Sequence, residues 1–220
     1  MSVIDEELRA LKESILKMAS LVEVSIRDAI KALMDSNNEL ADKIIKNDHM
    51  INMYDVKIDE DCVRLIAKRQ PVGWDLRFIT TAMKIITDLE RIGDYAVNIS
   101  ERAMEINIGL MPYLSLADIP RMKQIAQTMV KNAIDSFVKE DKSLAWDVIN
   151  KDDEVDDINT LIIDGLIAQM KASSETIVTA TKLINVSRNI ERIADHATNI
   201  AEMVIYMIEG KMIRHMHDAG

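Results

Sequence analysis

A thirteen-residue stretch occurs twice in this chain, about a hundred positions apart. The first copy, LERIGDYAVNISE, spans residues 89–101, and the second, IERIADHATNIAE, spans residues 190–202. Eight of the thirteen aligned positions are identical. A looser repeat pairs NDHMINMYDVKID at 47–59 with KDDEVDDINTLII at 151–163. Sequence that recurs at a fixed spacing indicates a repeated structural unit, so the fold has to be one that can be built twice in tandem.

The apolar residues follow the period of an α-helix. Ile4, Leu8, Leu11 and Ile15 are separated by steps of four, three and four, and the same pattern continues to Met34. Such spacing predicts one long amphipathic helix. Residues that end helices are scarce, since the 220 residues include six glycines and three prolines, and aromatic residues, which favour strands, make up only 4%. The chain is therefore predicted to be all-α.

Six long helices are predicted, three in each half. The turns between them are marked by SNNE (36–39), by Pro71 and Gly73, by KED (139–141) and by ASSE (172–175). Proline lacks the backbone donor that a helix needs, and the other residues favour caps and turns. The expected helices run from Ile4 to Met34, from about Leu40 to Lys68, from about Trp74 to Asn107, up to about Lys139, from about Lys142 to Lys171, and from about Ser174 to Glu209.

The segment IGLMPYLSLADIP, residues 108–120, is the predicted linker between the halves. It holds two of the three prolines and a glycine, and its Ser115 and Asp118 are spaced like a capping box. Helices of about 30 residues are about 45 Å long, and three of them can bury their apolar stripes together. The predicted fold is therefore two tandem, pseudo-repeated three-helix bundles, with one domain at residues 1–110 and the other at 111–220.

The chain is acidic, with a formal net charge of −10 and a calculated pI near 4.9. Such a surface is repelled by nucleic-acid phosphates and by anionic lipids, so no nucleic-acid partner is expected and any membrane contact is peripheral. The N-terminal MSVIDEELRA lacks the apolar segment of a secretory signal, and no run of about 18 apolar residues occurs. The cytoplasm is the expected location.

The repeated stretch keeps its acidic residues in both copies. Residues four apart lie on one face of a helix, and carboxylates at that spacing repel each other. The first half places Glu90, Asp94 and Asn98 at this spacing, opposite a helix whose acidic face carries Asp48, Asn52, Asp55 and Asp59. The second half places Glu191, Asp195 and Asn199 in the same way, opposite Asp152, Asp156 and Asn159. Both copies of the repeat therefore retain carboxylates that repel each other, which a purely structural helix does not need.

Two interpretations remain open from the residues alone. The acids can form a solvated face that is paired with Arg91, Arg192 or lysines. Alternatively, they can form a site for a hard cation such as Mg²⁺, Ca²⁺, Mn²⁺ or oxidised iron, which takes several oxygen ligands. His49 and His196 lie beside acids and are expected to pack between helices, with a role at a metal site as the alternative. The duplication, with the same asparagine in both copies, gives the cation site equal weight with the solvated acidic face.

The chain resembles the PhoU family of phosphate-specific transport system accessory proteins. The resemblance is carried by NDHMINMYDVKIDEDCVRLIAKRQPVGWDLRFI, DLERIGDYAVNI and NIERIADHATNI, and it extends over nearly the whole chain. It implies a pair of three-helix bundles, as the periodicity also predicts. It further implies iron or zinc clusters held by E/D-xxx-D motifs, which match Glu90/Asp94, Glu191/Asp195 and Asp55/Asp59 here. Asn159 and Ile163 break the last motif in the second half, so Asp152/Asp156 is the expected opposing pair there.

The resemblance implies a regulator rather than an enzyme. Its expected partners are the ATPase of the phosphate ABC transporter and a phosphate-sensing histidine kinase, and its expected effect is to keep the phosphate-starvation response off when phosphate is plentiful. A homodimer is the expected assembly. An alternative from another class is a carboxylate-bridged metalloenzyme or metal-storage bundle, and a third is a helical adaptor with empty acidic faces. The Glu-xx-His tetrapeptide of ferritin-type di-iron oxidases does not occur in the chain.

Overall fold

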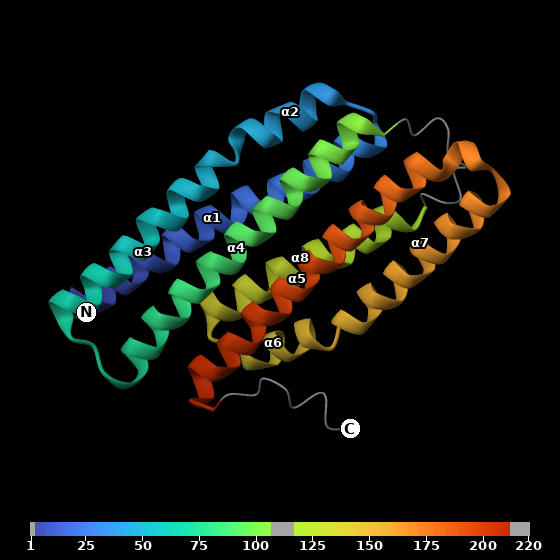
Figure 1. The fold of residues 1–220 in the computed structure, drawn as a ribbon. Coiled ribbons are helices and arrows are strands. Elements are labelled where there is room, and N and C mark those ends of the chain that lie inside the picture. Colours follow the sequence, from blue (N-terminus) through green and yellow to red (C-terminus); the bar gives the residue numbers. More distant parts are fainter. Residues whose placement is uncertain (1–2, 107–116, 212–220) are drawn as a thin grey trace.

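The structure is a computed structural model, and it describes residues 3–106 and 117–211. Within these ranges every regular element is helical, as Figure 1 shows. The helices of the first half are α1 (Val3–Met34), α2 (Asn38–Asn47), α3 (His49–Arg69) and α4 (Gly73–Glu105). Those of the second half are α5 (Asp118–Lys139), α6 (Lys142–Ile149), α7 (Asp152–Ala172), the short 3₁₀ turn η3 (Ser174–Thr176) and α8 (Ile177–Glu209). The predicted all-α architecture is confirmed.

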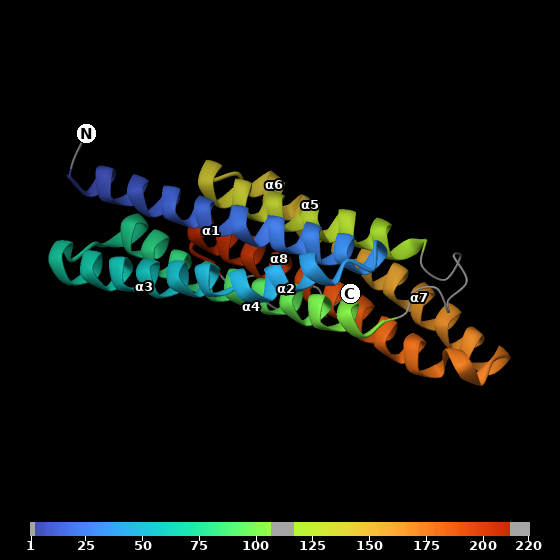
Figure 2. The ribbon, with the colours of Figure 1, turned by 90° about the horizontal axis from the view of Figure 1, so that it is seen from above.

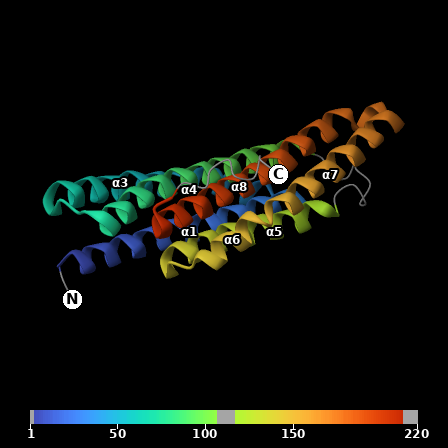
Figure 3. The same ribbon diagram turned by 90° about the horizontal axis from the view of Figure 1, so that it is seen from below.

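The helices form two layers, which are seen edge-on in Figures 2 and 3. In one layer α3, α4, α8 and α7 lie side by side in that order, and in the other α1 lies beside α5. The central helix α4 packs against α1, α3 and α8, and its counterpart α8 packs against α5, α7 and α4. The two bundles therefore meet through α4 against α8 and through α1 against α5.

The apolar stripes predicted from the spacing are the buried surfaces of the helices. In α1, Leu8, Leu11 and Ile15 are at most 6% exposed. Phe78 of α4 stacks on Phe137 of α5 with 4.9 Å between ring centroids, so the buried residues of the two halves join in one continuous core. Each buried side chain of this size contributes about 1.5–3 kcal/mol. The core thus fixes the relative positions of the central helices.

The predicted turns contain the expected caps. The side chain of Asn37 accepts a hydrogen bond from the backbone N–H of Leu40 at 3.0 Å. Asp141 caps α6 by accepting from two backbone N–H groups, and Glu140 before it adopts a left-handed conformation with φ of 57°. Such side-chain acceptors satisfy donors that a helix start leaves unpaired. The helix ends therefore lie within about two residues of the predicted positions.

Two helices that were predicted to be continuous are bent. The helix expected over 40–68 ends at Asn47 and resumes at His49, whose Nδ1–H donates to the Lys46 carbonyl at 2.7 Å. The helix expected over 142–171 breaks near Lys151, whose N–H bonds to the carbonyl three residues back rather than four. Side-chain competition for a carbonyl and a tightened turn both bend a helix locally. The apolar period passes through such bends unchanged, so the sequence predicted single helices.

The predicted linker at 108–120 lies largely outside the described residues, as does Ser115 of the predicted capping box. The described part resumes just before α5, which begins at Asp118. None of the helices in the described ranges contains a segment that is both long and apolar enough to cross a membrane.

Candidate functional site

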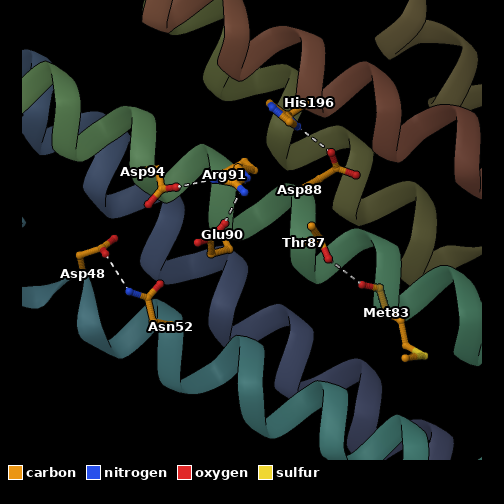
Figure 4. Close-up of polar contacts among 9 residues, drawn as sticks. All are labelled: Asp48, Asn52, Met83, Thr87, Asp88, Glu90, Arg91, Asp94 and His196. Carbon is orange, nitrogen blue, oxygen red and sulfur yellow. Dashed lines mark hydrogen bonds and ion pairs between the residues drawn. The ribbon is translucent and has the colours of Figure 1, made fainter.

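Four carboxylates gather where the chain around the start of α3 faces α4. Glu90 and Asp94 project from α4, while Asp48 precedes α3 and Asp55 lies in its second turn. We call these four residues the first acidic set. Burial raises the pKa of Glu90, and the negative charges of Asp94, Asp55 and Asp48 raise it further. Figure 4 shows Asp48 on one side of this region and the α4 acids on the other. The carboxylates therefore influence one another's protonation.

Arg91 provides a positive charge within the first acidic set. Its Nε lies 3.6 Å from Glu90 Oε2 and its Nη1 lies 3.2 Å from Asp94 Oδ2 (Figure 4). On the opposite side, Asp48 accepts a hydrogen bond from Asn52 Nδ2 at 3.0 Å. Arg91 is exposed, so these ion pairs contribute little to stability. Part of this face is thus ion-paired, as the first interpretation of the sequence supposed.

Gly93 allows α4 to approach the start of α3 closely. A Cβ atom at this position would lie 3.1 Å from Ile51 Cδ1 and 3.5 Å from Asp48 Oδ1. The glycine of the repeated stretch therefore leaves space for Asp48 beside α4. In the second copy the corresponding residue is Ala194, which is 1% exposed.

A second acidic set lies where α7 faces α8. It consists of Asp152 and Asp156 from α7 and Glu191 and Asp195 from α8. Burial and the charges of Asp195 and Asp156 raise the pKa of Asp152 to about 6. Burial raises the pKa of Glu191 in the same direction, with Asp195 and Asp156 adding to the effect. The two acidic sets therefore share one electrostatic character, which is crowded negative charge with partial loss of solvent.

One oxygen of the second acidic set has no partner. Asp152 Oδ1 is buried and accepts no hydrogen bond from the described residues, and the nearby Thr198 Oγ1 is buried and unpaired as well. The Thr198 hydroxyl favours the ionised form of Asp152 without reaching hydrogen-bonding geometry. An unsatisfied buried polar atom costs about 1–3 kcal/mol. A cation or an ordered water is the usual partner of such an atom.

The two acidic sets differ at two opposing positions, because Asp55 corresponds to Asn159 and Asn52 corresponds to Asp156. Asn159 of α7, which corresponds to Asp55 in the first half, donates from Nδ2 to Glu191 Oε2 at 2.9 Å. Its Oδ1 accepts from the Ser187 hydroxyl at 2.6 Å, and Asn159 is 7% exposed. A neutral amide therefore donates to Glu191 at the place where the first half has the Asp55 carboxylate. In the structure, the hydrogen bonds of Asn159 thus stand where the second half lacks the E/D-xxx-D motif.

Three other predicted ligands stand apart from the acidic sets. Asp59 is exposed on α3, and its charge adds to the effect of burial, which raises the pKa of Asp55. Asn98 lines a pocket with arginines of α4 and α8. Asn98 lies eight residues after Glu90, and eight residues turn a helix about 80° beyond two full turns. Asn98 therefore points away from Glu90, although residues only four apart share a face. Asn199 is half-buried on α8.

A buried pair that the sequence did not predict joins the two halves. Asp88 of α4 is 8% exposed, and its Oδ1 lies 2.6 Å from Nδ1 of His196 on α8 (Figure 4). The available signal was that His196 adjoins an acid, but its partner lies 108 positions away in the chain. Asp48 is a second residue that was noted on an acidic face but not chosen as a ligand. Its alignment with Asp152 in the repeat was the signal for it.

The donor chemistry of the acidic sets fits a hard cation. Both sets offer carboxylate oxygens, which such ions prefer, and Asp152 Oδ1 is an unpaired buried acceptor. As the side chains stand, no group of three or more His, Cys, Asp or Glu in the described ranges is close enough to hold a metal ion. Rotation of exposed acids such as Asp156 and Asp195 would be required to bring ligands together. The negative charges therefore already lie near one another, but the side chains are not arranged to coordinate a metal ion.

Comparison with known proteins identifies the repeated unit. The PhoU domain matches residues 15–103 and again residues 119–204. The chain belongs to the PhoU family. The first PhoU domain covers most of α1 to α4, and the second covers α5 to α8, so each acidic set lies within one domain.

Relatives of this PhoU-family protein match nearly its whole length. An Aquifex aeolicus protein named phosphate-specific transport system accessory protein PhoU homolog is 42% identical, over 96% of each chain. A Pseudomonas aeruginosa protein of the same name is 37% identical, over 96% of this chain and 87% of the relative. The crystal structure of PhoU from Pseudomonas aeruginosa superposes with a TM-score of 0.89 at 36% identity, and covers 94% of this chain and 99% of its own. The phosphate transport system regulatory protein PhoU from Streptococcus pneumoniae gives a TM-score of 0.89 at 28% identity, over 96% of this chain and 99% of its own. The prediction of two tandem, repeated helical bundles is thereby confirmed.

Proposed function

We propose that this PhoU-family protein is a cytoplasmic, non-enzymatic regulator of phosphate uptake and phosphate-starvation signalling. It links the ATPase of the phosphate ABC transporter to a phosphate-sensing histidine kinase and keeps the starvation response off when phosphate is plentiful. The observation that carries this proposal is the match, over 96% of the chain, to relatives named accessory proteins of the phosphate-specific transport system. The expected assembly is a homodimer, which light scattering of the purified protein can test.

The shape and charge of the molecule suit a scaffold that acts through protein contacts. The chain carries a net charge of −10, and the helices α3, α4, α8 and α7, which carry the two acidic sets, lie side by side in one layer. Complementary charge speeds the encounter of two proteins and helps to fix their orientation. Partner surfaces are therefore expected to be basic where they touch this layer, and binding is expected to weaken as salt is added.

We further propose that the two acidic sets bind metal ions. Asp48, Asp55, Glu90 and Asp94 would hold a cation in the first PhoU domain, and Asp152, Asp156, Glu191 and Asp195 would hold one in the second. Iron or zinc clusters are the first expectation, with Mn²⁺, Mg²⁺ or Ca²⁺ as the other candidates. A bound cation supplies positive charge, which removes the mutual repulsion of these carboxylates and connects two helices. The raised pKa values of Glu90 and Asp152 support this proposal because the neighbouring carboxylates add to the effect of burial on both groups.

The test of the regulatory role is a pull-down with two partners, the transporter ATPase and the cytoplasmic part of the kinase. We expect wild-type protein to capture both. Glu90→Ala/Asp94→Ala is expected to reduce capture if the metal supports the binding surface. Glu13→Ala/Asp164→Ala is the matched control, because it removes two exposed acids of α1 and α7 that lie outside both acidic sets. Failure of wild-type protein to bind either partner, with and without added metal, would contradict the proposal.

A turnover assay distinguishes the enzymatic alternative from the proposed regulator. Metal-loaded protein is assayed for phosphatase, esterase and oxidase turnover, with the double variant Glu191→Ala/Asp195→Ala as the control. A regulator is expected to retain metal without turnover. Turnover that disappears in the variant would support a carboxylate-bridged enzyme instead.

A further inference from the structure

A polar pocket of about 320 Å³ lies between the two central helices, outside both acidic sets. Its lining consists of Asn98 and Arg102 from α4 together with Asn185, Arg188, Asn189 and Arg192 from α8. The α8 residues occur at steps of three and four, so they present one face of that helix. The pocket therefore lies on the contact between the two PhoU domains.

The lining of this pocket is cationic although the chain as a whole is strongly acidic. Three arginines and three asparagines line it, and no carboxylate does. Arg102 donates to Glu105 at 2.9 Å, outside the pocket lining. Arg188 and Arg192 form no ion pair with any residue in the described ranges, and they act on Glu191 only at longer range. The Arg192 guanidinium rests over the Tyr95 ring, 5.8 Å from its centroid. Within the described residues, Arg188 and Arg192 therefore line the pocket without a close ion pair, although Arg192 also acts on Asp195 at longer range.

The internal repeat shows that positive charge is more concentrated on this side of the domain contact than on the equivalent side, where Lys84 stands for Asn185 and Thr87 stands for Arg188. In the repeat, position 189 corresponds to Asp88 and position 102 corresponds to Met203. The counterpart of the pocket lining therefore contains a carboxylate and a thioether where the pocket has an amide and a guanidinium. Arg91, the counterpart of Arg192, is already paired with Glu90 and Asp94. Duplication alone would have produced similar linings on both sides, so the concentration of positive charge is a separate feature.

We propose that this pocket binds a small phosphoryl anion. Guanidinium groups present planar pairs of N–H donors that match two oxygens of a tetrahedral phosphoryl group, and they remain charged at any physiological pH. Asparagine amides add N–H donors for further oxygens and carbonyl oxygens that accept from a P–OH group. A sulfate dianion lacks that hydroxyl, which gives the pocket a means of discrimination.

The same chemistry admits inorganic phosphate, pyrophosphate or the phosphate groups of a nucleotide. This inference requires neither the metal sites nor the protein partners proposed above. Its test uses the isolated full-length chain after treatment with a chelator, so phosphate cannot bind through a metal at the acidic sets. Failure of this test would leave the regulatory proposal standing, and failure of the pull-down would leave this one standing.

The experiment is isothermal titration calorimetry of the metal-free chain at low ionic strength with inorganic phosphate, pyrophosphate, ADP and sulfate. We expect saturable binding of at least one phosphoryl anion at one site per chain, sulfate at least tenfold weaker, and affinity that falls as sodium chloride is added. Arg188→Gln/Arg192→Gln is expected to weaken binding at least tenfold. Asn189→Asp, which installs the carboxylate found at the counterpart position, is expected to do the same.

The control is Lys43→Gln/Lys84→Gln, which removes two exposed positive charges from α2 and α4 outside the pocket and is expected to bind as wild type does. Arg188 is exposed, so Arg188→Gln alone serves as the variant whose fold is preserved if the double variant unfolds. The phosphoryl anion that binds most tightly, among inorganic phosphate, pyrophosphate and ADP, identifies the source of the phosphoryl group. The proposal is overturned by the absence of saturable binding for all three phosphoryl anions, by equal affinity for sulfate, or by unchanged binding in Arg188→Gln/Arg192→Gln and Arg188→Gln.

Discussion

Nδ1 of His196 lies 2.6 Å from Oδ1 of Asp88, which joins α8 to α4 across the contact between the two PhoU domains (Figure 4). The His196 ring also lies 5.6 Å from the ring of Tyr95, the residue that occupies the same place in the first copy of the repeat. Equivalent positions of the two copies thus face each other near the centre of the molecule. The relation between the halves is consequently held by polar contacts as well as by the apolar core.

We predict that His196→Ala lowers the free energy of unfolding more than Asp88→Asn does. His196→Ala leaves the buried Asp88 carboxylate without its partner, which costs about 1–3 kcal/mol. Asp88→Asn retains a carbonyl oxygen that can accept the same hydrogen bond, so its cost is expected to be below about 1 kcal/mol. Urea denaturation followed by circular dichroism measures both. Equal stability of His196→Ala and the wild type would show that the contact does not hold the domains together.

The fold was predictable because the features that determine it are local in the sequence. The apolar steps in α1 define its buried stripe, and the repeat of residues 89–101 at 190–202 shows that the arrangement occurs twice. The bends before His49 and near Lys151 could not be predicted in this way. They arise from hydrogen bonds that compete with the helical ladder, which leave the apolar period intact.

A second prediction concerns Asn159, which places a neutral amide beside Glu191. Asn159→Asp is expected to lower the free energy of unfolding of metal-free protein by about 1–3 kcal/mol at neutral pH, because a donated hydrogen bond becomes a repulsion between two partly buried carboxylates. The reciprocal variant, Asp55→Asn, relieves repulsion in the first acidic set and is expected to be neutral or stabilising. Both are measured by urea denaturation in the presence of a chelator. A stabilising effect of Asn159→Asp would contradict this account of the second acidic set.

The candidate site was predictable in part. The alignment of Glu90/Asp94 with Glu191/Asp195 identified the helices that carry acids, and the structure brings each pair near acids of the neighbouring helix. Asn98 was grouped with them because four-residue steps were treated as one face. Each four-residue step rotates the side chain about 40° around the helix axis, so after two steps Asn98 faces the pocket arginines rather than the acids. Which helix faces which is a tertiary property, so the pocket arginines could not be grouped from spacing alone.

The third prediction concerns the pH dependence of stability and rests on Asp152. Its pKa is raised from 3.8 to about 6 in the folded chain, so the folded state binds this proton more tightly than the unfolded state. The stability contributed by the protonated group is fully present below about pH 4 and is lost as the pH rises toward about 6. This loss amounts to at most about 3 kcal/mol. Asp152→Asn removes the titration.

The measurement is a series of urea denaturations of metal-free protein between pH 4 and pH 7, compared between the wild type and Asp152→Asn. The free energy of unfolding of Asp152→Asn, relative to the wild type, is expected to increase as the pH rises across this window. Glu13→Gln serves as a control, because it changes an exposed acid of α1 outside both acidic sets. A constant difference between Asp152→Asn and the wild type at every pH would show that Asp152 has an ordinary pKa.

The last prediction concerns metal binding at the first acidic set. Any ligand that binds only the folded state stabilises it by mass action, by about 2.7 kcal/mol at a hundredfold excess over its dissociation constant. Glu90→Ala/Asp94→Ala is expected to remove the part of this stabilisation that the first PhoU domain provides and to leave the second acidic set loaded. Without metal, the variant is expected to be no less stable than the wild type, because the partial burial and the repulsion that raise the pKa of Glu90 are both relieved, while only the exposed pairs to Arg91 are lost. Thermal melting with and without Mn²⁺, Fe³⁺ or Zn²⁺, together with metal analysis, measures both effects. Unchanged metal content in a variant that lacks all four acids at positions 90, 94, 191 and 195 would show that these faces are solvated and ion-paired rather than metal-binding.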